Sequence, residues 1–166
     1  MDAEVIVIRI LHVLPGVLWV GGSSLMAWVI EPQLRAAGPA VQGPAMNRIA
    51  KALTPVLSIA GGVTILMGFA LVARTPGRGF DDLFNTSWGW AIGLGLLTAF
   101  ISAGLGGSVG ATAKRMEAVG AQITDAPTPA QAAEMAALEG RLGRMSRIAS
   151  VFGVISLALM VSARYL

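Results

Sequence analysis

The sequence has no cysteine, a single histidine and few charged residues, and each scarcity narrows what the protein can be. Without cysteine there are no disulfide bonds and no thiolate-ligated metal sites. Only 13% of the 166 residues are charged, well below the soluble norm of about 25%. The net charge of +3 is small, and nothing in the chain supports nucleic-acid binding. These features predict an integral membrane protein.

Apolar residues dominate the chain. They make up 55% of the chain, and the mean hydropathy is +0.72. A helix needs about 20 apolar residues to cross a bilayer, and the sequence contains four apolar blocks of roughly that length separated by polar joints. We therefore expect an all-α bundle of four transmembrane helices in one domain, residues 1–166, with the lipid bilayer as its surroundings. The expected helices cover residues 5–30, 52–73, 87–113 and 130–164.

The fourth expected helix starts well before its apolar block. Thr128, Pro129 and Gln131 supply an N-cap, a first-turn proline and the partner of a capping box. This pattern predicts a helix that begins in the cytoplasm as an extension and runs unbroken into the bilayer. The alternative is an amphipathic helix lying flat on the membrane, which Arg141, Arg144 and Arg147 would also suit.

Basic residues are unequally divided between the two sides of the expected bundle. Cytoplasmic loops are enriched in Lys and Arg, so the richer side is assigned to the cytoplasm and both termini to the outside of the plasma membrane. The richer side holds Arg35, Arg48, Lys51, Lys114, Arg115, Arg141, Arg144 and Arg147, and the poorer side holds Arg9, Arg74, Arg78 and Arg164.

The histidine lies inside the first apolar block. Residues three, four and seven apart share a helix face, so His12, Gly16 and Trp19 form one stripe, with Arg9 one turn toward the outer surface. An ionisable ring within a membrane helix is a functional-site hypothesis, and a glycine one turn on leaves room for a flat ring. The alternative is that His12 only hydrogen-bonds a neighbouring helix and Gly16 only permits close packing.

The segment LHVLPGVLWVGG, followed by VIEP, and the later TSWGWAIGLGLL resemble two helices of a known family. These are the copper-resistance-D-like proteins and the related four-helix membrane haemoproteins, which include the HemJ type of protoporphyrinogen oxidase. The resemblance implies a four-helix fold and a tetrapyrrole or metal site at His12. Family members often carry a lysine or second histidine in the third helix, and residues 91–100 have neither. His12 is therefore the one functional residue carried over.

Depth along the helices selects candidate partners for a haem at His12. At a rise of about 1.5 Å per residue, His12 lies about 10 Å inside the outer edge, Met67 about 9 Å and Met160 about 5 Å. We expect His12 as one axial ligand of haem b and Met67, Met160 or no protein group as the other. Arg9, Arg74 or Arg164 would then meet the propionates.

Three functions remain open from the sequence. The first is haem binding in electron transfer, redox sensing or haem handling. The second is a structural or accessory subunit of a larger membrane complex or a homo-oligomer, packed through small-residue pairs at 89/93 and 106/110. The third is copper handling, although the eight methionines are scattered. No nucleophile and base are paired in the sequence, so an enzyme is not expected.

Overall fold

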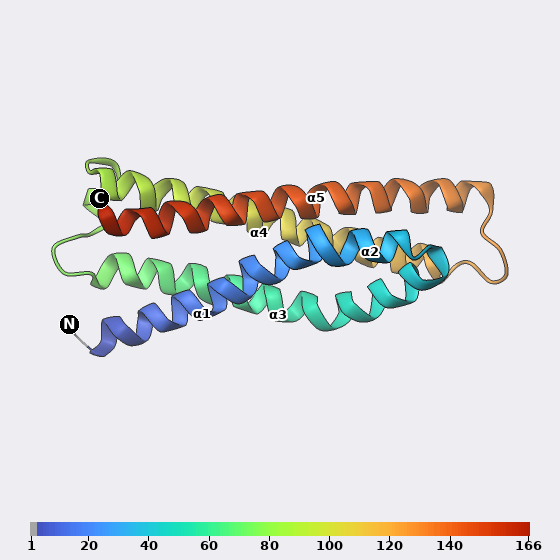
Figure 1. Cartoon of the computed structure of the whole chain (residues 1–166), viewed down its shortest axis with the longest axis horizontal. Coiled ribbons are helices and arrows are strands. Elements are labelled where there is room, and N and C mark those ends of the chain that lie inside the picture. Colours follow the sequence, from blue (N-terminus) through green and yellow to red (C-terminus); the bar gives the residue numbers. More distant parts are fainter. Residues whose placement is uncertain (1–2) are drawn as a thin grey trace.

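The computed structural model describes residues 3–166, which form an elongated bundle of helices (Figure 1). Four helical segments in this range are long and apolar enough to cross a membrane: Ala3–Ala36, Pro39–Arg74, Ser87–Gly120 and Pro129–Tyr165. This confirms the predicted all-α four-helix bundle. Each segment has 34 to 37 residues, and a rise of about 1.5 Å per residue makes it longer than a hydrocarbon core about 30 Å thick.

The first segment is continuous but not uniform. Helix α1, Ala3–Leu25, passes through a π-helical turn, η1, Met26–Ile30, into α2, Glu31–Ala36. The amide of Glu31 bonds the carbonyl oxygen of Met26, five residues back. Pro32 follows directly and has no amide hydrogen to donate. The sequence predicted that the helix stops near residue 30, but it continues for another turn because the widened turn accommodates the proline.

Helix α3, Pro39–Arg74, begins much earlier than the expected range 52–73. Only Ala37 and Gly38 separate it from α2, and Gly38 has a φ of 88° that suits glycine. Pro39 occupies the first helical position, where a missing amide costs nothing. The Gly-Pro pair at 38/39 therefore marks the turn and the helix start, whereas the pair at 43/44 lies within the helix.

The two remaining long helices begin with side-chain caps. Helix α4, Ser87–Gly120, starts at Thr86, whose hydroxyl accepts from the amide of Gly89 at 3.0 Å. Helix α5, Pro129–Ser162, starts with the predicted capping box between Thr128 and Gln131. Two short 3₁₀ turns complete the chain, η2, Phe80–Phe84, and η3, Ala163–Tyr165. Helix α4 continues seven residues beyond the expected end at 113.

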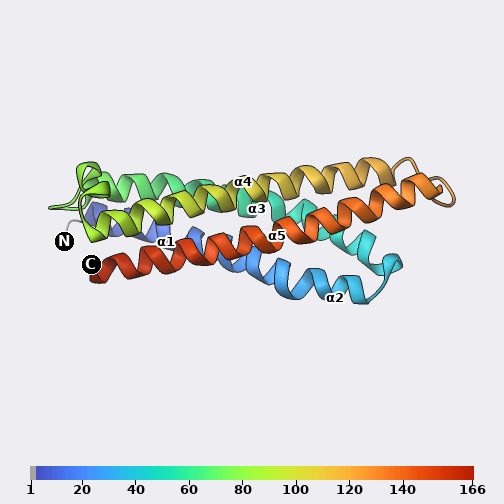
Figure 2. The same ribbon diagram turned by 90° about the horizontal axis from the view of Figure 1, so that it is seen from above.

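The bundle consists of two closely packed helix pairs. Helix α1 packs mainly on α3 and α4 mainly on α5, with smaller contacts of α3 with α4 and of α1 with α5. The two termini lie at one end, and the α2–α3 and α4–α5 connections lie at the other (Figures 1 and 2). We refer to these as the terminal end and the connection end.

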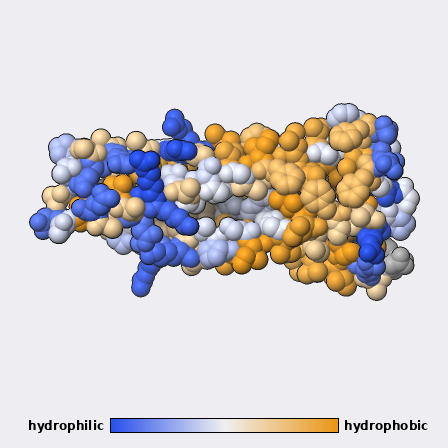
Figure 3. Space-filling model, turned by 180° about the vertical axis from the view of Figure 1, so that it is seen from behind, coloured by the Kyte–Doolittle hydropathy of each residue, from blue (hydrophilic) through white to orange (hydrophobic). Residues whose placement is uncertain are grey.

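The face of the bundle seen in Figure 3 divides along its length. Apolar side chains cover the half that includes the terminal end, while basic and acidic side chains gather on the half that includes the connection end (Figure 3, with the terminal end at the right). The helices are longer than a bilayer requires, so the polar half continues the bundle beyond the apolar band. This positions the connection end of α3, α4 and α5 next to water.

Candidate functional site

His12 lies in the contact between α1 and α3. Its Nδ1 atom is 2.7 Å from the carbonyl oxygen of Thr64, and the ring is half-buried. The same ring lies against Gly68, one turn further along α3: a Cβ atom there would be 3.0 Å from Cε1 and 3.2 Å from Nδ1. The absence of a side chain at Gly68 thus allows the imidazole to approach the α3 backbone.

This hydrogen bond decides the tautomer of the neutral ring. A main-chain carbonyl oxygen only accepts hydrogen bonds, so Nδ1 carries the proton and Nε2 keeps its lone pair. Nε2 is more than 4 Å from the Cβ position at Gly68 and so faces away from that residue. Histidines that ligate metals have the same arrangement, in which one ring nitrogen donates to a carbonyl and the other is the ligand.

The rest of the predicted stripe also faces α3. A Cβ atom on Gly16 would lie 3.2 Å from the Thr64 methyl group, so α1 and α3 are close at this level. Trp19 is buried and its indole covers Gly61, at 3.0 Å from that residue's Cβ position to Cε2. Gly16 therefore lets α1 approach α3 at Thr64, and Trp19 packs on α3 at Gly61, one turn away.

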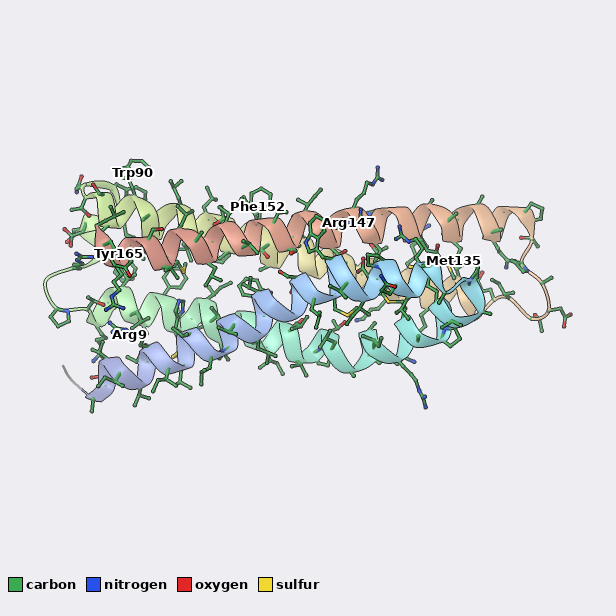
Figure 4. The ribbon with its side chains drawn as sticks, viewed as in Figure 1. Arg9, Trp90, Met135, Arg147, Phe152 and Tyr165 are labelled. Atoms are coloured by element: carbon green, nitrogen blue, oxygen red, sulfur yellow. The ribbon has the colours of Figure 1, made fainter. Side chains whose placement is uncertain are left out.

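The other predicted site residues are more widely distributed. Met67 is half-buried on α3, directly before Gly68. Met160 belongs to the other helix pair, where its Cγ atom is 3.0 Å from the Cβ position of Gly95 on α4. Arg9 is exposed near the terminal end of α1 (Figure 4). Thus His12, Gly16 and Trp19 lie along one interface, while Met160 packs in another.

Two further basic residues near the terminal end have contacts of their own. Arg74 pairs with Glu4 at 2.6 Å, which ties α3 to the first turn of α1. The guanidinium of Arg164 lies 6.0 Å from the centre of the Tyr165 ring. Both are at the surface, and of the three expected propionate partners Arg74 is the one that forms an ion pair within the described residues.

A second polar cluster lies toward the connection end, where η1 meets α5. Trp28 donates from Nε1 to the hydroxyl of Ser150 at 3.1 Å, and Ser24 shares a hydrogen bond of 2.9 Å with the same hydroxyl. One turn on, Ser146 donates to Oε2 of Glu31 at 2.9 Å. The π-helical turn lies between Ser24 and Glu31, so it sets the register that presents both to one face of α5.

Glu31 is only 7% exposed although it carries a carboxylate. Arg35 lies one turn further along α2, and its guanidinium lies against α5, with Nη2 at 2.8 Å from the Cβ position of Gly143. No salt bridge to Glu31 is present among residues 3–166. The glycine at 143 therefore creates the space in which Arg35 reaches α5 beside Glu31.

A cavity of about 760 Å³ opens next to Glu31 at the connection end. It lies between α2, α3, α4 and α5, and its lining includes Glu31 and Arg35 but none of the site residues expected from the sequence. Those residues lie nearer the terminal end. The protein thus has two distinct polar features, the His12 contact between α1 and α3 and the Glu31 cavity.

The sequence placed Glu31 at the end of the first helix but gave it no role. Its partner Ser146 is 115 positions away, so no local pattern connects them. The sequence signal that could have pointed to this contact is a carboxylate followed by a proline at the end of the first expected helix, together with two serines four residues apart, at 146 and 150, on a distant helix.

Comparison of the chain with protein-family models, with curated proteins and with solved structures found no match. The assignment of function consequently depends on the geometry of the two polar features.

Proposed function

We propose that the protein is an integral membrane protein that binds haem b, with Nε2 of His12 as an axial ligand of the iron. The observation that supports this is the hydrogen bond from Nδ1 to the Thr64 carbonyl. It leaves Nε2 as the basic nitrogen, orients the ring and increases its basicity as a ligand. A bound haem supplies one-electron redox chemistry, so electron transfer, redox sensing or haem handling is the corresponding role.

A lone histidine fits a haem better than it fits a free metal ion. Among the described residues no group of three or more His, Cys, Asp or Glu side chains could hold a metal ion. A copper site would need such a group or clustered methionines, whereas the porphyrin itself supplies four ligands and requires one or two from the protein. We therefore place haem ahead of copper handling.

Of the two methionines that could hold the iron together with His12, Met67 would be the better placed. Met67 is on the helix that His12 contacts, next to Gly68, whereas Met160 lies in the α4–α5 contact against Gly95. Methionine ligation raises the reduction potential relative to two histidines. Arg9, exposed near the terminal end, would meet a propionate where its charge is hydrated.

The competing function is a structural or accessory subunit. The same hydrogen bond supports it, because one acceptor satisfies the Nδ1–H of a half-buried neutral imidazole. In that case His12 joins α1 to α3 and ligates nothing. The two functions differ at Nε2. Haem binding requires this atom as an iron ligand, whereas the structural function does not use it.

The test uses protein purified from haem-replete cells, measured by optical spectrum and haem content. His12→Ala removes both nitrogens, whereas His12→Gln retains an amide that can donate to Thr64 but is a poor iron ligand. The proposal expects a Soret band in the wild type, its loss in both variants, and a shifted spectrum in Met67→Leu if Met67 is the second ligand.

Thermal stability of the haem-free proteins is the accompanying control. A wild type without Soret absorbance, or a His12→Gln variant that retains full haem content, would contradict haem ligation by His12. Loss of stability in His12→Ala but not in His12→Gln, with no haem in any sample, would identify the structural function.

A further inference from the structure

The cavity at the connection end has the size of a binding site for a small molecule. Its volume of about 760 Å³ lies within the range of roughly 300 to 1,000 Å³ typical of ligand pockets. It extends from Thr54 and Pro55, at the start of the apolar part of α3, to Met135 near the start of α5. The cavity therefore lies where the apolar band of the bundle gives way to its polar half.

Glu31 gives this cavity a specific chemical character. Its Oε2 atom accepts from Ser146, but Oε1 has no hydrogen-bond partner among residues 3–166. No polar side-chain atom that is fully buried lacks a partner in the described chain, so Oε1 keeps some accessible surface, and Glu31 is part of the cavity lining. A carboxylate so removed from bulk water is stabilised by a positively charged partner that donates hydrogen bonds.

The remaining lining is suited to an amphipathic molecule. Met46, Met116, Met135 and Leu142 supply apolar and adaptable walls. Lys51 of α3 and Glu117 of α4 pair with each other at 2.7 Å, which neutralises both charges within the cavity lining. The lining also contains Arg35, Lys114 and Glu139, but Glu31 is the one charged residue of the lining that is buried.

We propose that this cavity binds an amphipathic molecule with a primary ammonium group. The ammonium donates to Oε1 of Glu31, and the apolar part lies against the methionine side chains. Such a group occurs both in the headgroup of an aminophospholipid and in soluble alkylamines. This site is separate from His12, and the proposal does not depend on haem binding.

The experiment uses the delipidated full chain in detergent and two matched ligand pairs. Native mass spectrometry compares phosphatidylethanolamine with phosphatidylcholine of the same acyl chains, because the quaternary ammonium of the latter has no N–H donors. Thermal shift compares octylamine with octanol. We expect the amine to be preferred by about tenfold or more, the scale of one hydrogen bond to a charged group.

Three variants test whether the preference for the amine depends on Glu31 and on the cavity. Glu31→Gln retains an acceptor for Ser146 but removes the charge, and should abolish the preference for the amine. Ala50→Phe fills the cavity from α3 and should weaken binding while leaving Glu31 in place. Glu134→Gln is the matched control, since Glu134 is at the same end, pairs with Arg115 and does not line the cavity.

Preference for the lipid amine alone would identify a lipid ligand, and preference for octylamine alone a soluble one; both outcomes support the proposal. No preference for an amine in either pair, or a preference that persists at full strength in Glu31→Gln, would overturn it.

Discussion

The Nδ1 atom of His12 lies 2.7 Å from the carbonyl oxygen of Thr64, and this contact joins α1 to α3 in the apolar half of the bundle. It depends on Gly68, which gives the ring its place against the α3 backbone. The consequence is a histidine whose orientation is fixed by the backbone of another helix. The direction of its Nε2 atom therefore follows from a contact with main-chain atoms.

The first prediction concerns Gly68. In Gly68→Ala the new methyl group would be 3.0 Å from His12 Cε1, so the ring must shift and its bond to Thr64 must weaken. We expect lower thermal stability of the haem-free protein and lower haem content. Gly62→Ala is the control, because a Cβ atom there meets nothing within 4 Å, and alanine in a helix is favoured over glycine by about 0.5–1 kcal/mol. Equal behaviour of the two variants would exclude a specific role for Gly68.

The second prediction separates two glycines of α4. Gly95 is buried, with Met160 at 3.0 Å and Leu159 at 3.5 Å from its Cβ position, whereas Gly106 is exposed with no such neighbour. Gly95→Leu should cost about 1–3 kcal/mol or more by overpacking, and Gly106→Leu should leave the monomer unchanged. Thermal unfolding and size-exclusion chromatography measure both. Altered elution of Gly106→Leu would show that this face packs against another chain.

The third prediction concerns the hydrogen bond that Ser146 donates to Glu31. Ser146→Ala removes the donor to a buried carboxylate, which should destabilise the protein by about 1–3 kcal/mol because the acceptor is left unsatisfied. In the matched control Ser108→Ala, the lost hydroxyl is exposed and bonds only a carbonyl of its own helix, that of Gly104. Its stability should not change measurably. A Ser146→Ala protein as stable as the control would mean that Glu31 does not need the hydroxyl.

The fourth prediction is the orientation in the membrane. The two termini share one end of the bundle (Figure 1), and the excess of Lys and Arg lies in the segments that meet at the other end. A reporter fused after Gly120 should therefore be cytoplasmic, and a reporter at the C-terminus external. An external reporter after Gly120 would reverse the assignment.

Several structural features could be read directly from the chain. The number and type of helices follow from four apolar blocks, and the start of α5 from Thr128 and Gln131, because both signals are local. The stripe through His12, Gly16 and Trp19 was also correct as a face, since Trp19 is buried and the other two are half-buried against α3.

Other features were misread because tertiary context overrides local signals. The glycine and proline residues between 38 and 44 suggested a long joint, yet one turn at Gly38 suffices and α3 begins at Pro39. Gly106 and Gly110 make no tight contact within the chain, since Gly106 meets nothing within 4 Å among the described residues and Gly110 meets only Thr54, at 3.7 Å. Their packing against another chain stays a prediction. A small residue permits close approach without requiring it.

The sequence by itself determined that this is a four-helix protein with one histidine inside an apolar span and a basic bias on one side. These properties follow from the local composition of the chain and need no knowledge of packing. Only the tertiary structure decided that His12 donates to Thr64, that a π-helical turn brings Glu31 to Ser146, and that a cavity opens beside that carboxylate. Each depends on which helix faces which and at what register, and that is fixed by contacts between residues 52 and 115 positions apart.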